Sequence, residues 1–400
     1  MTTRAPNPSV IDIIGASPTL AVEEQARSLR RAGRSVVSFA AGEPDFPTPA
    51  HVVEAARRAC REPEAHRYGP TQGIEVLRVA IAGWMRSTAG SRYDPSEILV
   101  TNGAKQAIHH AFAALCGTDD EVIVPAPYWP TYVAAVRLAG ATPVIADSSP
   151  RAGWRVDVEQ LEALRTERTR AIVFASPANP TGAVASPEEV SAIAAWAARH
   201  GIWVVADEIY SQLVGGEASA PSMPALAPVV HDRCVVVNGV SKAYAMTGWR
   251  VGWLAGPAQI VRTASRLQSH VTSHVNNVAQ HAATAALEGD QACVERMRAA
   301  YDCRRRLLYD ALMDIDGIDC VEPRGAFYAF PSFAAYLGRS LRGRRIDSTV
   351  DLAGALLREA GVAVVAGEAF GAPGHARLAC AVSESQIADG VGRISAYLTD

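Results

Sequence analysis

Lysine is almost absent from this 400-residue sequence. Of its 38 basic residues, only Lys105 and Lys242 are lysine, and the other 36 are arginine. The 41 acidic residues bring the formal net charge to −3, so the chain lacks the basic excess with which nucleic-acid-binding proteins displace phosphate counterions. We expect no nucleic-acid partner.

Paired cysteines and long apolar runs are absent as well. The seven cysteines are scattered and never form a CxxC pair, which argues against a disulfide framework and against a zinc site. No stretch approaches the ~18 apolar residues of a membrane-spanning helix, and residues 1–10 lack the apolar core of a signal peptide. We expect a cytoplasmic protein with no membrane partner and no bound metal.

The sequence does contain enough apolar surface for a folded core. Hydrophobic residues make up 49% and charged residues 20% of the chain, a balance that excludes intrinsic disorder. At this length we expect one large domain with a smaller one, or two domains of similar size.

Short runs rich in valine and isoleucine alternate with helical patterns from about residue 95 onward. Four such runs are residues 121–125 (EVIVP), 171–175 (AIVFA), 202–206 (IWVVA) and 234–238 (CVVVN). They are typical of strands buried on both faces of a parallel sheet. The alternation predicts an α/β fold with helices on both faces of the sheet, and ligands bind beyond the carboxyl ends of such strands.

Helix and domain boundaries are predicted from local signals. Ser186 and Glu189 form a capping-box pattern that opens a helix over residues 187–200. The C-terminal part shows strand-like residues 325–331, 362–365 and 377–382, a helix over residues 349–360, and a long joining helix from about residue 288 to 313. We expect residues 1–50 to form an N-terminal arm and part of a small α+β domain, residues 51–300 the large domain, and residues 301–400 the small C-terminal domain.

Polar groups follow two of the predicted strands. Residues 176–182 (SPANPTG), which include Asn179, come after one strand, and Asp207 to Tyr210 (DEIY) come after the next. The first segment is either a plain turn or part of a ligand site. Asp207 is either a helix N-cap or a functional anion.

Lys242 follows the strand at residues 234–238, in a loop where a cation is ordinarily a solvated surface charge. This chain otherwise uses arginine for that purpose. The lysine amine can lose its proton and act as a nucleophile, whereas the guanidinium stays charged. Lys242 therefore indicates amine chemistry, and a Schiff base is the obvious case.

Lys105 lies where Gly103 enters a predicted helix over residues 106–115. A helix start favours a bound anion such as phosphate, because its N–H groups are free and its dipole is positive there. The backbone N–H groups of Ala104 and Lys105 are the expected ligands, and the Lys105 side chain either adds charge or covers the helix end.

A Schiff-base lysine, a phosphate site, a carboxylate and a phenol together suit pyridoxal 5′-phosphate. Its pyridine nitrogen needs a facing carboxylate, and Asp207 fits that need. Tyr210 or Asn179 could donate to the ring O3′, and Arg250 could clamp the phosphate. Trp129, next to the first predicted strand, is either a stacking partner of the ring or part of the core.

These residues resemble the fold-type I pyridoxal-phosphate-dependent aminotransferases (class I/II), and most of all their aspartate/prephenate aminotransferase branch. The branch motif SKAYAMTGWRxG matches residues 241–252. Further blocks follow in the family's order at residues 41–46 (AGEPDF), 68–73 (YGPTQG), 101–107 (TNGAKQA), 179–182 (NPTG), 207–210 (DEIY) and 325–328 (GAFY). The resemblance implies a large domain with a mainly parallel seven-stranded sheet sandwiched by helices, and a smaller α+β domain.

The resemblance also implies residue roles around the cofactor. Lys242 would hold the cofactor as an internal aldimine and then carry protons, with Asp207 on the pyridine nitrogen and Tyr210 and Asn179 on O3′. Trp129 would stack on the ring. The phosphate ligands would be Gly103, Ala104, Lys105, Ser241 and Arg250, with Tyr68 of the partner subunit.

For the substrate, the resemblance implies that Arg377 grips the α-carboxylate, with Gly42, Asn179 and Trp129 beside it. Sharing of active-site residues between subunits implies a homodimer. The expected activity is transfer of an amino group between an L-amino acid and a 2-oxo acid by a ping-pong mechanism. The alternative is a lyase, γ-replacement or carbon–carbon bond-forming enzyme on the same scaffold, acting for example on a substrate similar to S-adenosylmethionine.

Two positions depart from the branch pattern. A lysine that contacts the distal carboxylate of the substrate in relatives is replaced here by Gly15. A Thr-Thr-Ser-Pro stretch reads Thr-Ser-His-Val at residues 272–275, which places His274 near the partner's site as a side-chain reader, a proton carrier or a packed interface residue. Both changes weaken the expectation of an acidic substrate and favour an uncharged, heterocyclic or cationic side chain.

Overall fold

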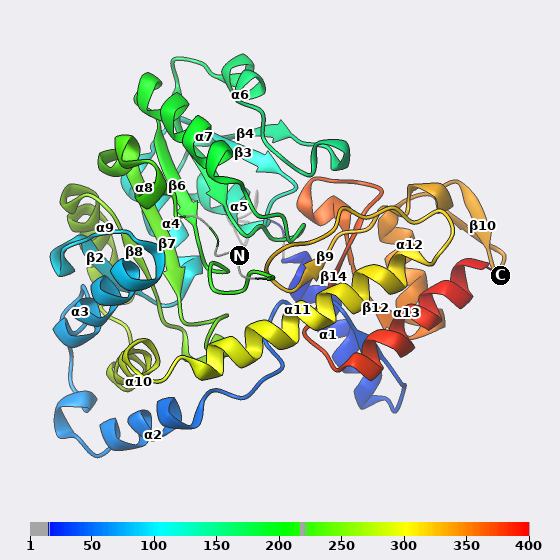
Figure 1. Cartoon of the computed structure of the whole chain (residues 1–400), viewed down its shortest axis with the longest axis horizontal. Coiled ribbons are helices and arrows are strands. Elements are labelled where there is room, and N and C mark those ends of the chain that lie inside the picture. The colour runs from blue at the N-terminus through cyan, green and yellow to red at the C-terminus, as the bar shows by residue number, and fades with distance from the viewer. Residues whose placement is uncertain (1–14, 16, 217–219, 221, 400) are drawn as a thin grey trace, which may run out of the picture.

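A seven-stranded sheet forms the centre of the larger part of the molecule (Figure 1). The computed structural model describes residues 15, 17–216, 220 and 222–399. The strands lie in the order β2-β8-β7-β6-β5-β3-β4, and β8 alone runs antiparallel to its neighbours in this sheet. Their bounds are β2 (Ile98–Thr101), β3 (Glu121–Ala126), β4 (Thr142–Asp147), β5 (Thr169–Ala175), β6 (Trp203–Asp207), β7 (Cys234–Gly239) and β8 (Gly252–Ala255).

The predicted mainly parallel sheet is therefore confirmed, and each of the four predicted runs is one of its strands. Strand β7 shows why these runs lack alternation, since all six of its residues are buried. Val235 and Val237 belong to the hydrophobic core on one face, and Cys234 and Val236 belong to the core on the other face. Both faces are apolar because helices cover both.

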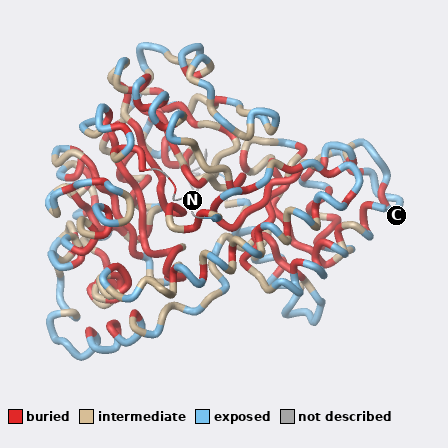
Figure 2. Tube along the Cα trace, viewed as in Figure 1, coloured by how far each residue is buried: buried red, intermediate tan, exposed pale blue. Residues whose placement is uncertain are grey.

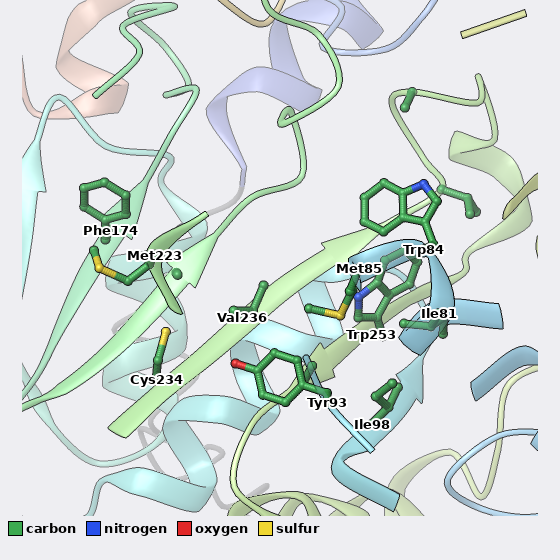
Figure 3. Packing of buried hydrophobic residues seen from close by; sticks show 14 of the residues in the cluster. Ile81, Trp84, Met85, Tyr93, Ile98, Phe174, Met223, Cys234, Val236 and Trp253 are labelled. Carbon is green, nitrogen blue, oxygen red and sulfur yellow. The ribbon is translucent and has the colours of Figure 1, made fainter. Parts of the chain in front are cut away.

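Helices form a layer on each face of the sheet. One core contains side chains from α4 (Ala104–Leu115), α5 (Thr131–Leu138) and α9 (Ala258–Val271). The other contains side chains from α2 (Ala50–Ala59), α3 (Glu75–Trp84), α7 (Pro187–His200), α8 (Met223–Leu226) and α10 (Asn277–Glu288), and α6 (Val158–Leu164) also contributes. Figure 3 shows this second core, where the rings of Trp84 and Trp253 meet edge to face with centroids 5.7 Å apart.

Helix α7 has the predicted bounds and the predicted cap. The Glu189 backbone N–H donates to Ser186 Oγ at 3.3 Å, and the Ser186 N–H donates to Glu189 Oε2 at 2.8 Å. The helix ends at Gly201, whose φ of 67° is the left-handed conformation that glycine adopts readily.

The smaller part surrounds a three-stranded antiparallel sheet in the order β13-β14-β9. A parallel pair, β1 with β12, and a hairpin, β10 with β11, complete its strands in the described residues. The bounds are β1 (Val37–Ser38), β9 (Tyr328–Ala329), β10 (Arg339–Leu341), β11 (Arg344–Ile346), β12 (Val362–Ala363), β13 (Val365–Ala366) and β14 (Ala376–Ala379), with helices α1 (Pro18–Arg31), α12 (Thr349–Ala355) and α13 (Glu384–Thr399). The predicted small α+β unit is present.

The strand predicted over residues 325–331 is wrong in length, because only β9 within it belongs to the sheet, while Gly325 forms an isolated bridge with Val214. The Ala326 backbone N–H donates to Leu213 O at 2.7 Å, and Ala326 O accepts from Arg305 Nη1 at 3.0 Å. These groups are therefore satisfied outside the sheet, which shortens the strand.

Helix α11 (Ala292–Met313) joins the two parts and runs diagonally between them across the view in Figure 1. The predicted start at residue 288 is wrong, because α10 extends to Glu288 and the Gln291 side chain donates to Gly289 O at 2.7 Å between the helices. Val294 packs in the core of the large part, and Met297 packs in the core of the small part. Figure 2 shows both buried regions. The division at residues 50 and 300 stays a prediction.

Within the described residues, no helix combines the length and apolar character needed to span a bilayer. The same residues contain no group of three or more histidine, cysteine or acidic side chains placed to hold a metal ion. The expected cytoplasmic location stays a prediction.

Candidate active site

The carboxyl ends of β3, β5, β6 and β7 open onto one cavity of about 440 Å³. Neighbouring parallel strands end at the same edge of a sheet, so the segments after them meet there. The N-terminal helix α1 and strand β14 supply the facing wall. Eleven of the predicted site residues line this cavity: Gly42, Ala104, Lys105, Trp129, Asn179, Asp207, Tyr210, Ser241, Lys242, Arg250 and Arg377. Three others, Gly103, Tyr68 and His274, do not line it.

Lys242 presents its amine inside the cavity. Its Nζ donates to the Gly42 carbonyl oxygen at 2.5 Å and lies 5.8 Å from the centroid of the Tyr210 ring. Burial, together with the charges of Arg377 and Arg250, lowers the pKa of Lys242 to about 8, against the opposing charges of Glu43 and Asp207. A substantial fraction of this amine is therefore neutral near pH 8, as a nucleophilic amine requires.

Asp207 ends strand β6 below the lysine. Its Oδ2 accepts from Tyr132 Oη at 2.7 Å, and its Oδ1 accepts from the Ile209 N–H at 3.1 Å. Burial raises the pKa of Asp207, whereas these two hydrogen bonds and the charge of Lys242 act in the opposite direction. The carboxylate is thus buried, hydrogen-bonded on both oxygens, and suited to pair with a cationic ring nitrogen.

Two tyrosines meet at the opposite side of the lysine. The hydroxyls of Tyr210 and Tyr328 lie 2.7 Å apart, and burial raises the pKa of each phenol. Both phenols stay protonated at neutral pH, so one of the pair has a proton to donate into the cavity.

Arg377 is buried, only 2% exposed, on strand β14. Its Nη2 donates to Ala40 O at 2.7 Å and its Nη1 to Asn179 Oδ1 at 3.1 Å. The guanidinium lies over the rings of Tyr328 and Phe370, at 4.7 and 5.1 Å. No carboxylate pairs with it among the described residues, and its Nε has no hydrogen-bond partner there. A buried and uncompensated guanidinium is suited to bind a carboxylate from a ligand.

The start of helix α4 lines the cavity next to Arg250. Gly103 precedes this helix with a φ of 79°, and a Cβ there would lie 2.9 Å from Arg250 Cζ, so glycine admits the guanidinium. Arg250 donates to Thr247 O at 2.8 Å and to Asn102 O at 3.2 Å, which fixes its position. Gly103 thus acts from behind the cavity wall, by making room for Arg250.

The exposed residue Lys105 lines the cavity beside Trp129. Its Nζ lies 5.1 Å from the centroid of the Trp129 ring, and the described residues offer it no hydrogen bond or ion pair. Burial, and then the charge of Arg250, lower its pKa. Lys105 is thus an unpaired cation that faces the same space as Lys242.

Together these groups fit pyridoxal 5′-phosphate. A partly neutral lysine, a buried carboxylate, a protonated phenol and a helix start with a fixed arginine are the partners that the aldehyde, pyridine nitrogen, O3′ and phosphate of this cofactor require. Trp129 contributes an aromatic wall between the lysine and the helix start.

Tyr68 and His274 lie together outside the cavity of their own chain. Tyr68 is 92% exposed, and its ring meets the His274 ring edge to face at 5.9 Å. His274 Nδ1 donates to Val275 O at 2.7 Å, and Nε2 accepts from the Gly69 N–H at 3.1 Å. Both ring nitrogens are bonded within the same chain, one to Val275 and the other to Gly69 of the segment that carries Tyr68, which favours the packed role among the alternatives. Their predicted place at a partner's site stays a prediction.

Sequence reasoning assigned no role to Tyr132 or Tyr328. Tyr328 ends the GAFY block, so its presence in that motif was an available signal. Tyr132 follows Trp129 by three residues at the start of α5, and only the proximity of α5 to strand β6 places its hydroxyl on Asp207.

Known proteins similar to this chain are aminotransferases. The profile of the family described as aminotransferase class I and II matches residues 34–394. An aspartate aminotransferase from Streptomyces avermitilis is 52% identical over 390 residues, which cover 98% of this chain and 96% of that protein. An aspartate/prephenate aminotransferase from Cereibacter sphaeroides is 39% identical over 383 residues, which cover 95% of this chain and 96% of that protein.

Solved structures agree with these sequence similarities. The aspartate aminotransferase of Rhizobium meliloti superimposes with a TM-score of 0.94 at 36% identity, and 99% of each chain is covered. The aspartate aminotransferase of Thermus thermophilus with maleate gives a TM-score of 0.92 at 39% identity, with 99% of this chain and 100% of that chain covered.

The predicted fold class and the predicted aminotransferase activity are both confirmed by these relatives. The lyase alternative gains no support, because the relatives named above are aminotransferases. Members of the matched family use pyridoxal 5′-phosphate. The chain therefore belongs to the class I and II aminotransferase family, and it is a transferase of amino groups.

Proposed function

We propose that this chain binds pyridoxal 5′-phosphate through Lys242 and transfers the amino group of an acidic amino acid, aspartate in the first place, to a 2-oxo acid. When bound, the cofactor supplies an electron sink that stabilises negative charge on the substrate Cα. We infer the substrate class from two cations without an acidic partner, Arg377 and Lys105, which line the same cavity as Lys242.

Lys242 provides the base. Its neutral amine would hold the cofactor, and Nζ, once free of it, would be the atom that takes the proton from the substrate Cα. The lowered pKa supports both roles, because an amine with a pKa of about 8 gains or loses a proton near neutral pH at a small cost in free energy. The Gly42 carbonyl orients Nζ by accepting its hydrogen bond.

Asp207 and Tyr210 hold the cofactor ring in the electronic state that the reaction needs. Asp207 keeps a proton on the pyridine nitrogen, and Tyr132 supports the ionised form of that carboxylate by donating to Oδ2. Tyr210 donates towards O3′, with Tyr328 as its hydrogen-bond partner. Ser241, the N–H groups at the start of α4 and Arg250 bind the phosphate.

Charge accounting favours a substrate with two carboxylates. The cofactor phosphate would neutralise Arg250, and Asp207 would face the pyridine nitrogen. Arg377 then remains for the α-carboxylate, and Lys105 remains for a second one. Three other charged residues line the cavity, and each has a partner: Arg27 pairs with Glu24 at 3.4 Å, Glu23 pairs with Arg30 at 3.4 Å, and Glu43 accepts from the Thr247 hydroxyl at 3.0 Å.

The replacement of the relatives' lysine by Gly15 is weaker evidence against an acidic substrate than the sequence pattern suggests. Gly15 does not line the cavity, whereas Ser17 and Thr19 of the same segment do. Lys105 supplies a cation from the opposite wall, so the loss of a lysine at residue 15 leaves a partner for a distal carboxylate. Aspartate aminotransferases among the relatives support the same substrate class.

The test is a set of half-reactions followed by absorbance. The purified protein is expected to be yellow, and borohydride is expected to fix the cofactor on Lys242. L-Aspartate should convert the bound cofactor to its amine form faster than L-alanine or L-histidine does. Lys105→Met should raise the KM for aspartate at least tenfold, and it should change the KM for alanine less than twofold.

Two results would count against this function. If Lys242→Ala still gave a reducible imine, the assignment of the lysine would be wrong. If Lys105→Met affected aspartate and alanine equally, the second carboxylate would have another partner. Arg27→Gln serves as the matched control, because it removes a cation from the same cavity that is already paired.

We also propose a homodimer in which Tyr68 reaches the phosphate of the partner's site. A fully exposed aromatic side chain outside its own cavity supports this proposal. Mixing Lys242→Ala chains with Tyr68→Phe chains should give more activity than the two separate preparations, because one site of the mixed dimer regains both residues. A monomer in sedimentation analysis, or no gain on mixing, would contradict it.

A further inference from the structure

A second cavity, of about 240 Å³, lies behind the wall of the active-site cavity. Its walls come from the ends of β3 and β5, the loop after β5 and the first turns of α7, with residues 321–324 of the small part on the other side. Tyr132 and Asn179 line both cavities. The two spaces therefore share a wall made of side chains that hold active-site groups.

Apolar and polar side chains both line this second cavity, and several of the apolar ones are buried. Ile172, Phe174 and Ile193 form part of its lining and are each less than 9% exposed. A space of this volume lies just below the ~300 Å³ lower limit of typical small-molecule pockets. It therefore suits a ligand about the size of an amino acid with an apolar side chain.

The mouth of the second cavity carries charges of both signs. Arg155, Glu189, Glu322 and Arg324 all line it. Arg155 Nε lies 3.7 Å from Glu189 Oε1, whereas the side chains of Glu322 and Arg324 make no hydrogen bond or ion pair within the described part of the chain. A zwitterion matches such a mouth, with its carboxylate on a guanidinium and its ammonium on a carboxylate.

Occupation of this cavity would act on the neighbouring site through the shared wall. Tyr132 donates to Asp207 at 2.7 Å, and Asn179 accepts from Arg377 at 3.1 Å. A ligand against their other sides restrains both residues. Because the cavity has walls from the large and the small part, the ligand also fixes the spacing between them.

We propose that the second cavity binds an amino acid with an apolar or aromatic side chain as an effector of the aminotransferase. The binding itself is independent of the substrate proposed above, whereas the effect on activity rests on that proposed function. By linkage, the effector and a substrate analogue change each other's affinity by the same factor.

The test uses the complete holoenzyme and α-methyl-L-phenylalanine as the probe. This compound has no Cα proton and cannot be transaminated. Isothermal titration is carried out with the active site saturated by maleate, so that binding to Arg377 does not contribute. We expect one bound probe per chain, and a change of at least twofold in kcat or KM for aspartate when the probe is saturating.

Three variants locate the binding. Arg324→Gln removes an exposed and unpaired guanidinium, so it should fold normally and weaken binding at least tenfold. Ala185→Phe should abolish binding, because it places a ring in the cavity. Arg296→Gln is the matched control, an exposed arginine on α11 that lines neither cavity, and it should bind the probe like the wild type.

The proposal fails if the maleate-saturated wild type does not bind the probe, or if all three variants bind it equally. Binding without any change in kcat or KM would overturn the effector role. If maleate itself did not bind, the proposed acidic substrate would be wrong. The comparison of the three variants would still show whether the probe binds in the second cavity.

Discussion

Tyr132→Phe removes one hydroxyl from the active site and leaves the buried ring in place. The lost contact is the 2.7 Å hydrogen bond to Asp207 Oδ2. A hydrogen bond to a charged group contributes about 1.5–3 kcal/mol, and about 1.4 kcal/mol corresponds to a factor of ten in rate. If the whole of this free energy is added to the barrier for proton transfer, kcat should fall about 10- to 100-fold.

The direction follows from the electrostatics of Asp207. Burial already raises the pKa of this carboxyl, and the Tyr132 hydroxyl opposes that rise by stabilising the ionised form. Without the donor the pKa moves further up, and pairing with a protonated pyridine nitrogen weakens. The measurement is steady-state kcat and KM for aspartate across pH, with the absorbance of the bound cofactor recorded in parallel.

Tyr93→Phe is the matched control. Tyr93 is also buried, but its hydroxyl has no hydrogen-bond partner among the described residues. Its loss should leave kcat unchanged. A kcat of Tyr132→Phe within twofold of the wild type, in a protein of unchanged melting temperature, would show that Tyr132 does not support Asp207 in the reaction.

Three further predictions concern the cofactor and carboxylate sites. The cofactor-free protein should take up the cofactor faster as the pH rises, and the rate should level off above about pH 8, because the neutral form of the Lys242 amine reacts and its pKa is about 8. Stopped-flow absorbance measures this rate, and a rate that does not change between pH 6 and 8 would contradict the prediction. Gly103→Ala should raise the dissociation constant of the cofactor at least tenfold, because the added Cβ would collide with Arg250 and the positive φ of residue 103 disfavours alanine. Equilibrium dialysis measures this constant, and an unchanged value would show that the contact is unimportant. Arg377→Lys should raise the KM for every amino donor at least tenfold with a smaller change in kcat, and a selective effect on aspartate alone would reassign this arginine to the side chain of the substrate.

The sequence predicted well those features that depend on neighbouring residues. The Ser186 and Glu189 pattern placed helix α7 because a cap satisfies backbone groups within one turn. The valine-rich runs placed the sheet, and the position of Asp207 and Lys242 after them placed the cavity. In these cases the chemistry follows from the order of residues along the chain.

Features that depend on distant parts of the chain were missed. Tyr132 and Asp207 are 75 residues apart, and no local pattern indicates their contact. Residues 325–331 have a strand-like composition, but Arg305 and Leu213 take up the backbone groups of Ala326. The interpretation of the Gly15 departure stays a prediction, and the place of Lys105 beside Trp129, on which the alternative depends, is a tertiary property that no local pattern indicates.

The scarcity of lysine makes this protein an unusual target for amine-specific reagents. Both lysine side chains line the same cavity, so a reagent that acylates side-chain amines reports on the state of that cavity and on little else. A lysine-specific endoprotease has only two cleavage sites, one at the exposed Lys105 in the first turn of α4 and one at the half-buried Lys242 after β7. Because Lys105 lies within helix α4, cleavage there requires local unfolding of that helix, whereas cleavage at Lys242 requires opening of the cavity or global unfolding.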